Sequence, residues 1–168
     1  MYQKSSGLIK TKPMIKADVL ITNKNWIKRI KSPNFYVNKK LKKIGKKNNP
    51  FKKNNFSFTI LLSGDSEVRK LNIKFRNRKN TTDILSFPFH EKFSLNELLK
   101  KKTKKIYLGD IIINLNKINY KTEDGDFFLN FDKIWIHGLV HLLGYRHKSN
   151  FDFSIMKKVE NKLLRSIR

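Results

Sequence analysis

The chain has 168 residues, the size of one ordinary domain, and 39% of them are hydrophobic. This composition supports a packed interior and excludes general disorder, so we predict a single domain over residues 1–168. The absence of cysteine excludes disulfides, thiol nucleophiles and thiolate metal ligands. With 38 Lys and Arg against 13 Asp and Glu, the net charge is +25. That charge indicates a polyanionic partner, of which nucleic acid is the first candidate.

A membrane span is not expected. The longest apolar run, residues 134–145, is interrupted by two histidines and is shorter than the roughly 18 to 20 residues that a spanning helix needs. The first sixteen residues are basic but contain no apolar stretch long enough for a secretory signal. We therefore expect a cytoplasmic protein.

In the first half of the chain, hydrophobic periodicity predicts strands and helices in alternation. A strand is expected over residues 15–21, followed by a helical region over 25–46 that breaks at Pro33. Residues 56–63 alternate apolar and other side chains, which predicts a half-buried strand. Gly64 then turns the chain, and Asp65 is expected to cap a helix that runs to about Phe75.

In the second half, residues 76–82 predict an exposed loop, and strands are expected over 83–87 and 107–114. The lysine-rich stretches 39–53 and 100–105 are interpreted as a helix end with a loop, and as a loop. An apolar helix over 134–143 stops at Gly144, and a terminal amphipathic helix follows. The predicted fold class is α+β: one mixed β-sheet packed with several helices.

Three of the four histidines lie in the segment HGLVHLLGYRH. His137 and His141 are four residues apart, so on a helix their rings project from the same face at a separation that suits two ligands of one metal. A left-handed residue at Gly144 would reverse the chain and bring His147 beside them. The segment therefore predicts a metal site of three imidazoles on the C-terminal helix and the turn after it.

Three imidazoles favour one Zn²⁺ ion, with the fourth position open to water as in catalytic sites. Such a site supports hydrolysis, because zinc lowers the pKa of a bound water toward roughly 7. A zinc peptidase of the HExxH type has its general base after the first histidine, and here that residue is Gly138. The missing glutamate disfavours a peptidase, and the basic charge favours a phosphodiester substrate.

The sequence resembles the YbeY endoribonuclease family in three segments. The segment from His137 to His147 is similar to the family signature HGxLHLxGYDH, and LNIKFRNRKNTTDILSFPF is similar to its LNxxYR and PTDVLSFP blocks. LGDIIIN is similar to its LGDI strand. Together these segments span roughly the last two thirds of the chain in the family's order.

The resemblance implies a metal-dependent, single-strand-specific endoribonuclease that acts in ribosomal RNA processing, including maturation of the small-subunit rRNA 3′ end, and in ribosome quality control. It implies zinc on His137, His141 and His147 and a catalytic role for Arg76, which matches the arginine that ends LNxxYR. The implied partners are RNA, in particular ribosomal RNA, and the small ribosomal subunit. A guanidinium at Arg76 is physically suited to pair with a phosphate.

The chain departs from the family pattern at two positions, since Arg146 stands where the family usually has Asp and Thr81 replaces the usual Pro. Arg146 reverses a charge beside the third predicted ligand. Asp83, Asp110 and Ser86 are left outside the predicted site, and His90 is interpreted as a surface residue. Two alternatives stay open: a zinc metallopeptidase, and a non-catalytic ribosome-binding module with a structural zinc.

Overall fold

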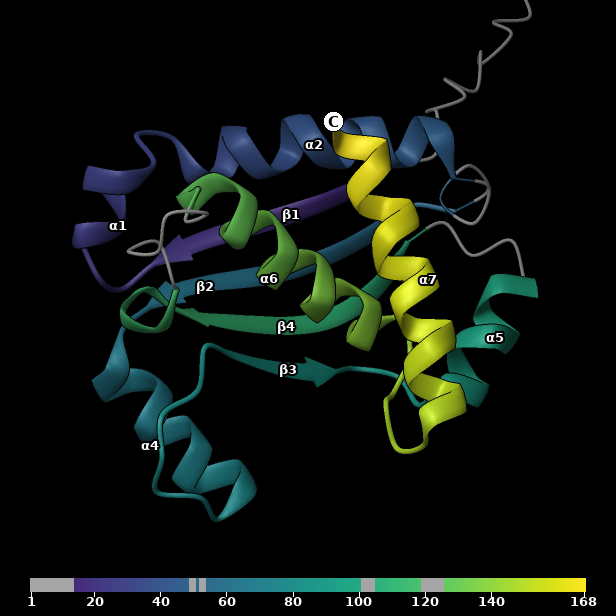
Figure 1. Cartoon of the computed structure of the whole chain (residues 1–168). Helices are drawn as coiled ribbons and strands as arrows, with labels where there is room; N and C mark the ends of the chain where they lie inside the picture. Colours follow the sequence, from purple (N-terminus) through teal and green to yellow (C-terminus); the bar gives the residue numbers. More distant parts are fainter. Residues whose placement is uncertain (1–13, 49–50, 52–53, 101–104, 119–125) are drawn as a thin grey trace, which may run out of the picture.

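The computed structural model describes residues 14–48, 51, 54–100, 105–118 and 126–168, without the side chains of residues 92–95. Its centre is one mixed sheet in the order β1-β2-β4-β3 (Figure 1). The strands are β1 (Ile15–Ile21), β2 (Phe56–Ser63), β3 (Ile84–Pro88) and β4 (Ile106–Asn114). β1, β2 and β4 run parallel, and β3 pairs antiparallel with β4 at one edge.

Helices cover both faces of this sheet. The larger core joins the sheet to α1 (Asn25–Arg29), α2 (Pro33–Lys47), α6 (Phe127–Leu142) and α7 (Asn150–Ile167). The smaller core joins the other face to α4 (Asp65–Arg76). The helix α5 (Lys92–Lys100) follows β3, and a 3-10 turn, η1 (Leu115–Lys117), follows β4.

The strand β4 shows why the sheet needs helices on both sides. Successive side chains of a strand point to opposite faces. Ile111 and Ile113 belong to the larger core, whereas Ile112 packs with Val68 and Leu85 in the smaller one. A continuous apolar run is therefore what a strand buried on both faces requires.

The structure confirms the predicted fold class, and the strands differ from their predicted ends by one residue at most. Pro33 is the first residue of α2, where its missing N–H costs no hydrogen bond. The helix that carries the first two histidines begins at Phe127 rather than at Ile134. Asp126 caps it, since its carboxylate accepts a hydrogen bond from the Phe128 backbone N–H at 2.9 Å.

The structure corrects one prediction, adds one helix and describes part of the two lysine-rich stretches. Asp65 does not cap α4: Gly64 is the N-cap residue, and the Asp65 carboxylate instead accepts a hydrogen bond from Asn114 Nδ2 at 2.8 Å. The helix α5, which ends at Lys100, was not predicted. Of the two lysine-rich stretches, residues 39–47 are helical, and residues 49–50, 52–53 and 101–104 lie outside the described residues.

Within the described part of the chain, no helix has both the length and the apolarity needed to cross a membrane.

Candidate metal centre

The position of α6 depends on its close approach to the sheet at Gly138. A β-carbon built on Gly138 would lie 2.8 Å from Ile84 Cδ1 and 3.0 Å from Ile111 Cδ1. Only a residue without a side chain allows the helix backbone to lie this near β3 and β4. The residue after His137 therefore faces the sheet, so a glutamate here would point into the apolar core rather than toward the histidines.

The end of α6 brings the third histidine back to the helix. Gly144 has a φ of +86°, the left-handed conformation that was predicted for it. Its N–H donates to the His141 carbonyl at 2.9 Å, and the Tyr145 N–H donates to the Val140 carbonyl at 3.2 Å. These two bonds form a Schellman motif, which ends the helix and reverses the chain toward His147.

The three predicted histidines come together as one group. His137, His141 and His147 each offer a ring nitrogen, and these nitrogens all lie within 4.8 Å of one another. The Nε2 atoms of His137 and His141 are 3.0 Å apart. Two nitrogens bound tetrahedrally to one zinc ion at normal bond lengths lie about 3.3 Å apart. The group could therefore hold a metal ion after small rotations of the rings.

Hydrogen bonds at the outer ring nitrogens orient two of these imidazoles. His137 Nδ1 lies 2.6 Å from Glu160 Oε1 on α7, and His141 Nδ1 lies 2.9 Å from the Tyr145 carbonyl oxygen. Both partners accept hydrogen bonds, so in the neutral rings the protons belong on Nδ1. Both Nε2 atoms, 3.0 Å apart, are then unprotonated, so each has a lone pair to offer a cation.

The electrostatics of the group favour neutral imidazole at His141 and a charged carboxylate behind His137. Burial, followed by the neighbouring His137, lowers the pKa of His141 to about 4. Burial on its own would raise the pKa of Glu160, but the hydrogen bond and charge of His137, with the charge of Lys157, bring it below its usual value. The site thus holds an imidazole ready to bind a metal and an ionised residue that orients its neighbour.

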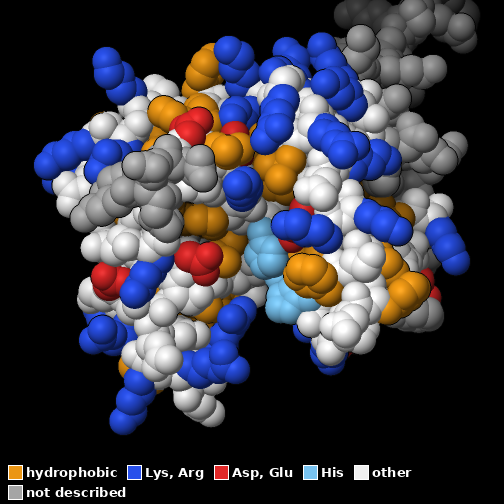
Figure 2. Space-filling view, in the orientation of Figure 1, with side chains coloured by type: hydrophobic (Ala, Val, Ile, Leu, Met, Phe, Trp, Pro, Cys, Tyr) orange, Lys and Arg blue, Asp and Glu red, His pale blue; other side chains and the backbone are white. Residues whose placement is uncertain are grey.

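The histidines lie in a cleft of about 400 Å³, seen as the central hollow that holds the pale blue side chains in Figure 2. Arg76, the exposed last residue of α4, forms part of the same wall. Arg146 and Lys148 add two more cations, and Asp83 is the one acid among the lining residues described. The cleft is therefore suited to an anionic ligand.

All four predicted site residues lie at this cleft, and the sequence reasoning missed residues in its wall and one behind His137. Glu160 was not identified, although an acid among Met156, Leu163 and Ile167 on the buried stripe of an amphipathic helix is a recognisable signal. Asp83 and Ser86, which the sequence analysis placed outside the site, both line the cleft. Asp110 is outside that wall, where its carboxylate accepts a hydrogen bond from the Tyr107 hydroxyl at 2.6 Å.

The fold and the site together define a small α+β protein with a three-histidine group, able to bind a metal ion, in a basic cleft. Comparison with known families finds a match to the model described as Endoribonuclease YbeY over residues 20–168. The chain therefore belongs to the YbeY endoribonuclease family, as its motifs predict.

Individual relatives agree with this assignment. The chain is 39% identical to "Endoribonuclease YbeY" of Pelagibacter ubique, with 92% of this chain and 97% of the relative covered. It is 33% identical to the protein of the same name from Thermodesulfovibrio yellowstonii, with 89% and 91% covered. A Thermotoga maritima protein of known solution structure is similar in fold, with a TM-score of 0.54 and 22% identity over 92% of this chain and 89% of that one.

Proposed function

We propose that this chain is a single-domain, zinc-dependent endoribonuclease that cleaves single-stranded regions of ribosomal RNA in the cytoplasm. Its proposed roles are maturation of the small-subunit rRNA 3′ end and ribosome quality control. The observation that carries the proposal is the pair of Nε2 atoms, 3.0 Å apart and both oriented by acceptors at Nδ1, in a cleft with three cations. Membership in the endoribonuclease family supports RNA as the substrate.

The donor set suits one zinc ion. His137, His141 and His147 would hold it, and three protein ligands leave a position open, as in catalytic zinc sites. A bound ion would supply Lewis-acid chemistry, that is, activation of water and neutralisation of charge on a phosphate oxygen. Among the described residues, no side chain other than these histidines belongs to the group, which supports an open position.

The chain's own residues orient the ligands and bind the substrate. Glu160 keeps the His137 proton on Nδ1, and the Tyr145 carbonyl does the same for His141. Arg76 faces the same cleft from α4, where its guanidinium would pair with a phosphate oxygen and stabilise the charge that develops there. Gly138 supplies no general base, which supports phosphodiester rather than peptide hydrolysis.

The proposal is tested by metal analysis and RNA cleavage with the same preparations. We expect one zinc ion per chain, cleavage lost in His141→Ala, and cleavage about 100-fold slower in Arg76→Ala. His90→Ala is the matched control, because His90 lies outside the three-histidine group, with its ring against Phe89. It should keep both zinc and activity.

RNA affinity separates a nuclease from a binding module with a structural zinc. In a nuclease, His141→Ala abolishes hydrolysis while RNA affinity largely survives. In a structural-zinc module, the same change lowers the melting temperature and RNA affinity together, and the wild type has no cleavage to lose. A wild type that cleaves RNA without any bound metal would contradict the proposed mechanism.

A further inference from the structure

Two further hollows extend from the histidine cleft along α7. A hollow of about 330 Å³ shares Asp83, Ile84 and His137 with the cleft. Lys133, Lys157 and Asn161 also line it. Asn161 in turn lines a third hollow, of about 430 Å³, where the end of α2 meets α7. Shared lining residues thus make a continuous surface from the candidate metal centre to the α2–α7 junction.

Four of the six residues that line the third hollow are cations. Its charged residues are Lys47 at the end of α2 and Lys158, Lys162 and Arg165 on α7, and all four are exposed. We call these four residues the α7 track. Figure 2 shows Lys and Arg side chains gathered over α2 and α7, on the same face of the molecule as the histidines.

The charges of the α7 track are not neutralised within the described part of the protein. Among the described residues, the ion pairs are Lys40 with Asp132, and Glu160 with both His137 and Lys157. None of them involves a residue of the α7 track. Helix α2 contains no acidic residue, and the only acids on α7 are Asp152 and Glu160. Asp152 accepts the Ser149 hydroxyl at 2.9 Å. Four exposed cations without carboxylate partners need a polyanion or solvent ions to balance them.

The spacing of the α7 track follows the helix axis. Lys158, Lys162 and Arg165 are four and three residues apart, which places them on one face of α7. With a rise of 1.5 Å per residue, they extend about 10 Å along the axis. A row of cations beside a groove is the arrangement that follows a phosphate backbone without reading its bases.

We infer that an RNA strand bound at the histidine cleft continues along α7, and that the α7 track binds its phosphates at the α2–α7 junction. The inference rests on the proposed function, because it extends the RNA site of the same cleft. It assigns these four residues to substrate binding and none of them to the chemical step. It therefore predicts that long RNA gains affinity from the α7 track and that very short RNA does not.

The test compares two triple variants that carry the same charge. Lys158→Gln, Lys162→Gln and Arg165→Gln together lower the formal net charge from +25 to +22, a change of three charges. The control combines Lys24→Gln, Lys28→Gln and Lys31→Gln, three exposed residues in or next to α1, with the same change of charge. Fluorescence anisotropy would measure their affinity for RNAs of about 4 and about 16 nucleotides, the range of common single-strand site sizes.

The α7 variant should bind the longer RNA about tenfold or more weakly, with the shorter RNA nearly unaffected. Affinity falls as salt rises, and each lost phosphate contact makes the slope of log affinity against log salt shallower by about 0.7. The slope of the α7 variant should therefore be shallower by about 2. The control should change affinity less than twofold. Equal weakening by both variants, or no weakening by either, would overturn the inference.

Binding is measured with a chelator present, so the result does not depend on cleavage or on zinc. A chain that binds RNA through the α7 track but never cleaves it would contradict the proposed function and still support the inference about the α7 track. Cross-linking a photoreactive nucleotide at the far end of the longer RNA gives a second measurement that needs no variant. Cross-links on α7 or the end of α2 support the inference, and cross-links confined to α4 or β1 overturn it.

Discussion

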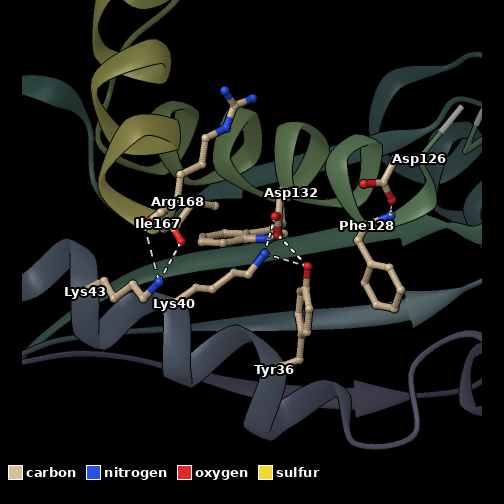
Figure 3. A network of polar contacts seen from close by, with 9 residues as sticks. Tyr36, Lys40, Lys43, Asp126, Phe128, Asp132, Ile167 and Arg168 are labelled. Carbon is tan, nitrogen blue, oxygen red and sulfur yellow. Dashed lines mark hydrogen bonds and ion pairs between the residues drawn. The ribbon is translucent and has the colours of Figure 1, made fainter. Parts of the chain in front are cut away.

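The two halves of α6 each carry a polar cluster, and the clusters differ in what completes them. In the N-terminal half, the buried Asp132 carboxylate pairs with Lys40 and accepts hydrogen bonds from Tyr36 Oη at 3.2 Å and Trp135 Nε1 at 3.0 Å (Figure 3). Tyr36 and Lys40 both come from α2. This cluster is closed, because the protein supplies every partner that the carboxylate needs.

In the C-terminal half, the histidine cluster is completed only on its outer side. Glu160 and the Tyr145 carbonyl bind the Nδ1 atoms, while the Nε2 atoms of His137 and His141 face each other at the cleft. A closed cluster joins helices, and an open one keeps donor atoms for a ligand. The same helix therefore has one half whose polar groups are paired within the protein and one half whose donor atoms could hold a metal ion.

The largest loss of stability is expected at Gly138, which lies between the two clusters and packs α6 against the sheet. Gly138→Glu would direct a carboxylate at Ile84 and Ile111, with no hydrogen-bonding partner and no space. We expect the free energy of unfolding to fall by more than about 4 kcal/mol, measured by chemical denaturation. Lys133→Glu, at an exposed position of the same helix, is the control and should change it little. A stable Gly138→Glu protein would contradict the packing described for α6.

Breaking the closed cluster should cost stability and spare the open one. Asp132→Ala removes the acceptor of the Trp135 N–H and the counter-charge of Lys40. The Lys40 ammonium, whose side chain is 21% exposed, then keeps only the Tyr36 hydroxyl, at 2.6 Å, as an acceptor within the cluster. We expect a loss of about 3 kcal/mol, the low end for a buried pair because Lys40 keeps some solvent contact. Zinc stoichiometry at a temperature where the variant is folded should be unchanged. Loss of zinc with the fold intact would mean that the two halves of α6 are coupled.

Disturbing the open cluster should lower metal affinity and leave the stability of the fold nearly unchanged. Glu160→Gln keeps the size of the side chain but weakens the charged acceptor of His137 Nδ1. Partners of this kind are worth 10- to 100-fold in metal affinity, so we expect a loss on the order of 10-fold or more in a competitive zinc titration. The melting temperature of the metal-free protein should move little. Unchanged zinc affinity would contradict the role of Glu160 in orienting His137.

The smallest effect concerns the response of the closed cluster to alkaline pH. Burial, followed by the charge and hydrogen bond of Asp132, raises the pKa of Tyr36 above its ordinary value of 10.0. A raised pKa means that the folded state favours the neutral phenol, so this stabilisation is complete below pH 10 and is lost as pH rises above it. Denaturation of the wild type and of Tyr36→Phe should therefore converge at high pH. A constant difference across that range would contradict the shift.

The local elements follow from short sequence patterns. The period of two over residues 56–63 and the apolar face of the terminal helix depend only on neighbouring residues, so the strands and helices could be predicted within a few positions. The helix α5 was missed although Leu95, Leu98 and Leu99 recur at helical spacing between its two terminal lysines. The Asp65 prediction was wrong because the side chain has a stronger option in Asn114, a residue 49 positions away.

The sequence by itself determined that three imidazoles meet, because an i,i+4 pair on one helix and a glycine-ended turn are local geometry. It also determined the family and the basic character of the molecule. Only the tertiary structure decided that Glu160 stands behind His137 and that Arg76 and Asp83 share the cleft. It also decided that an intermediate hollow, which shares lining residues with the cleft and Asn161 with the hollow of the α7 track, lies between the two. These partners come from separate elements, and their meeting depends on how the helices pack on the sheet, which no short pattern encodes.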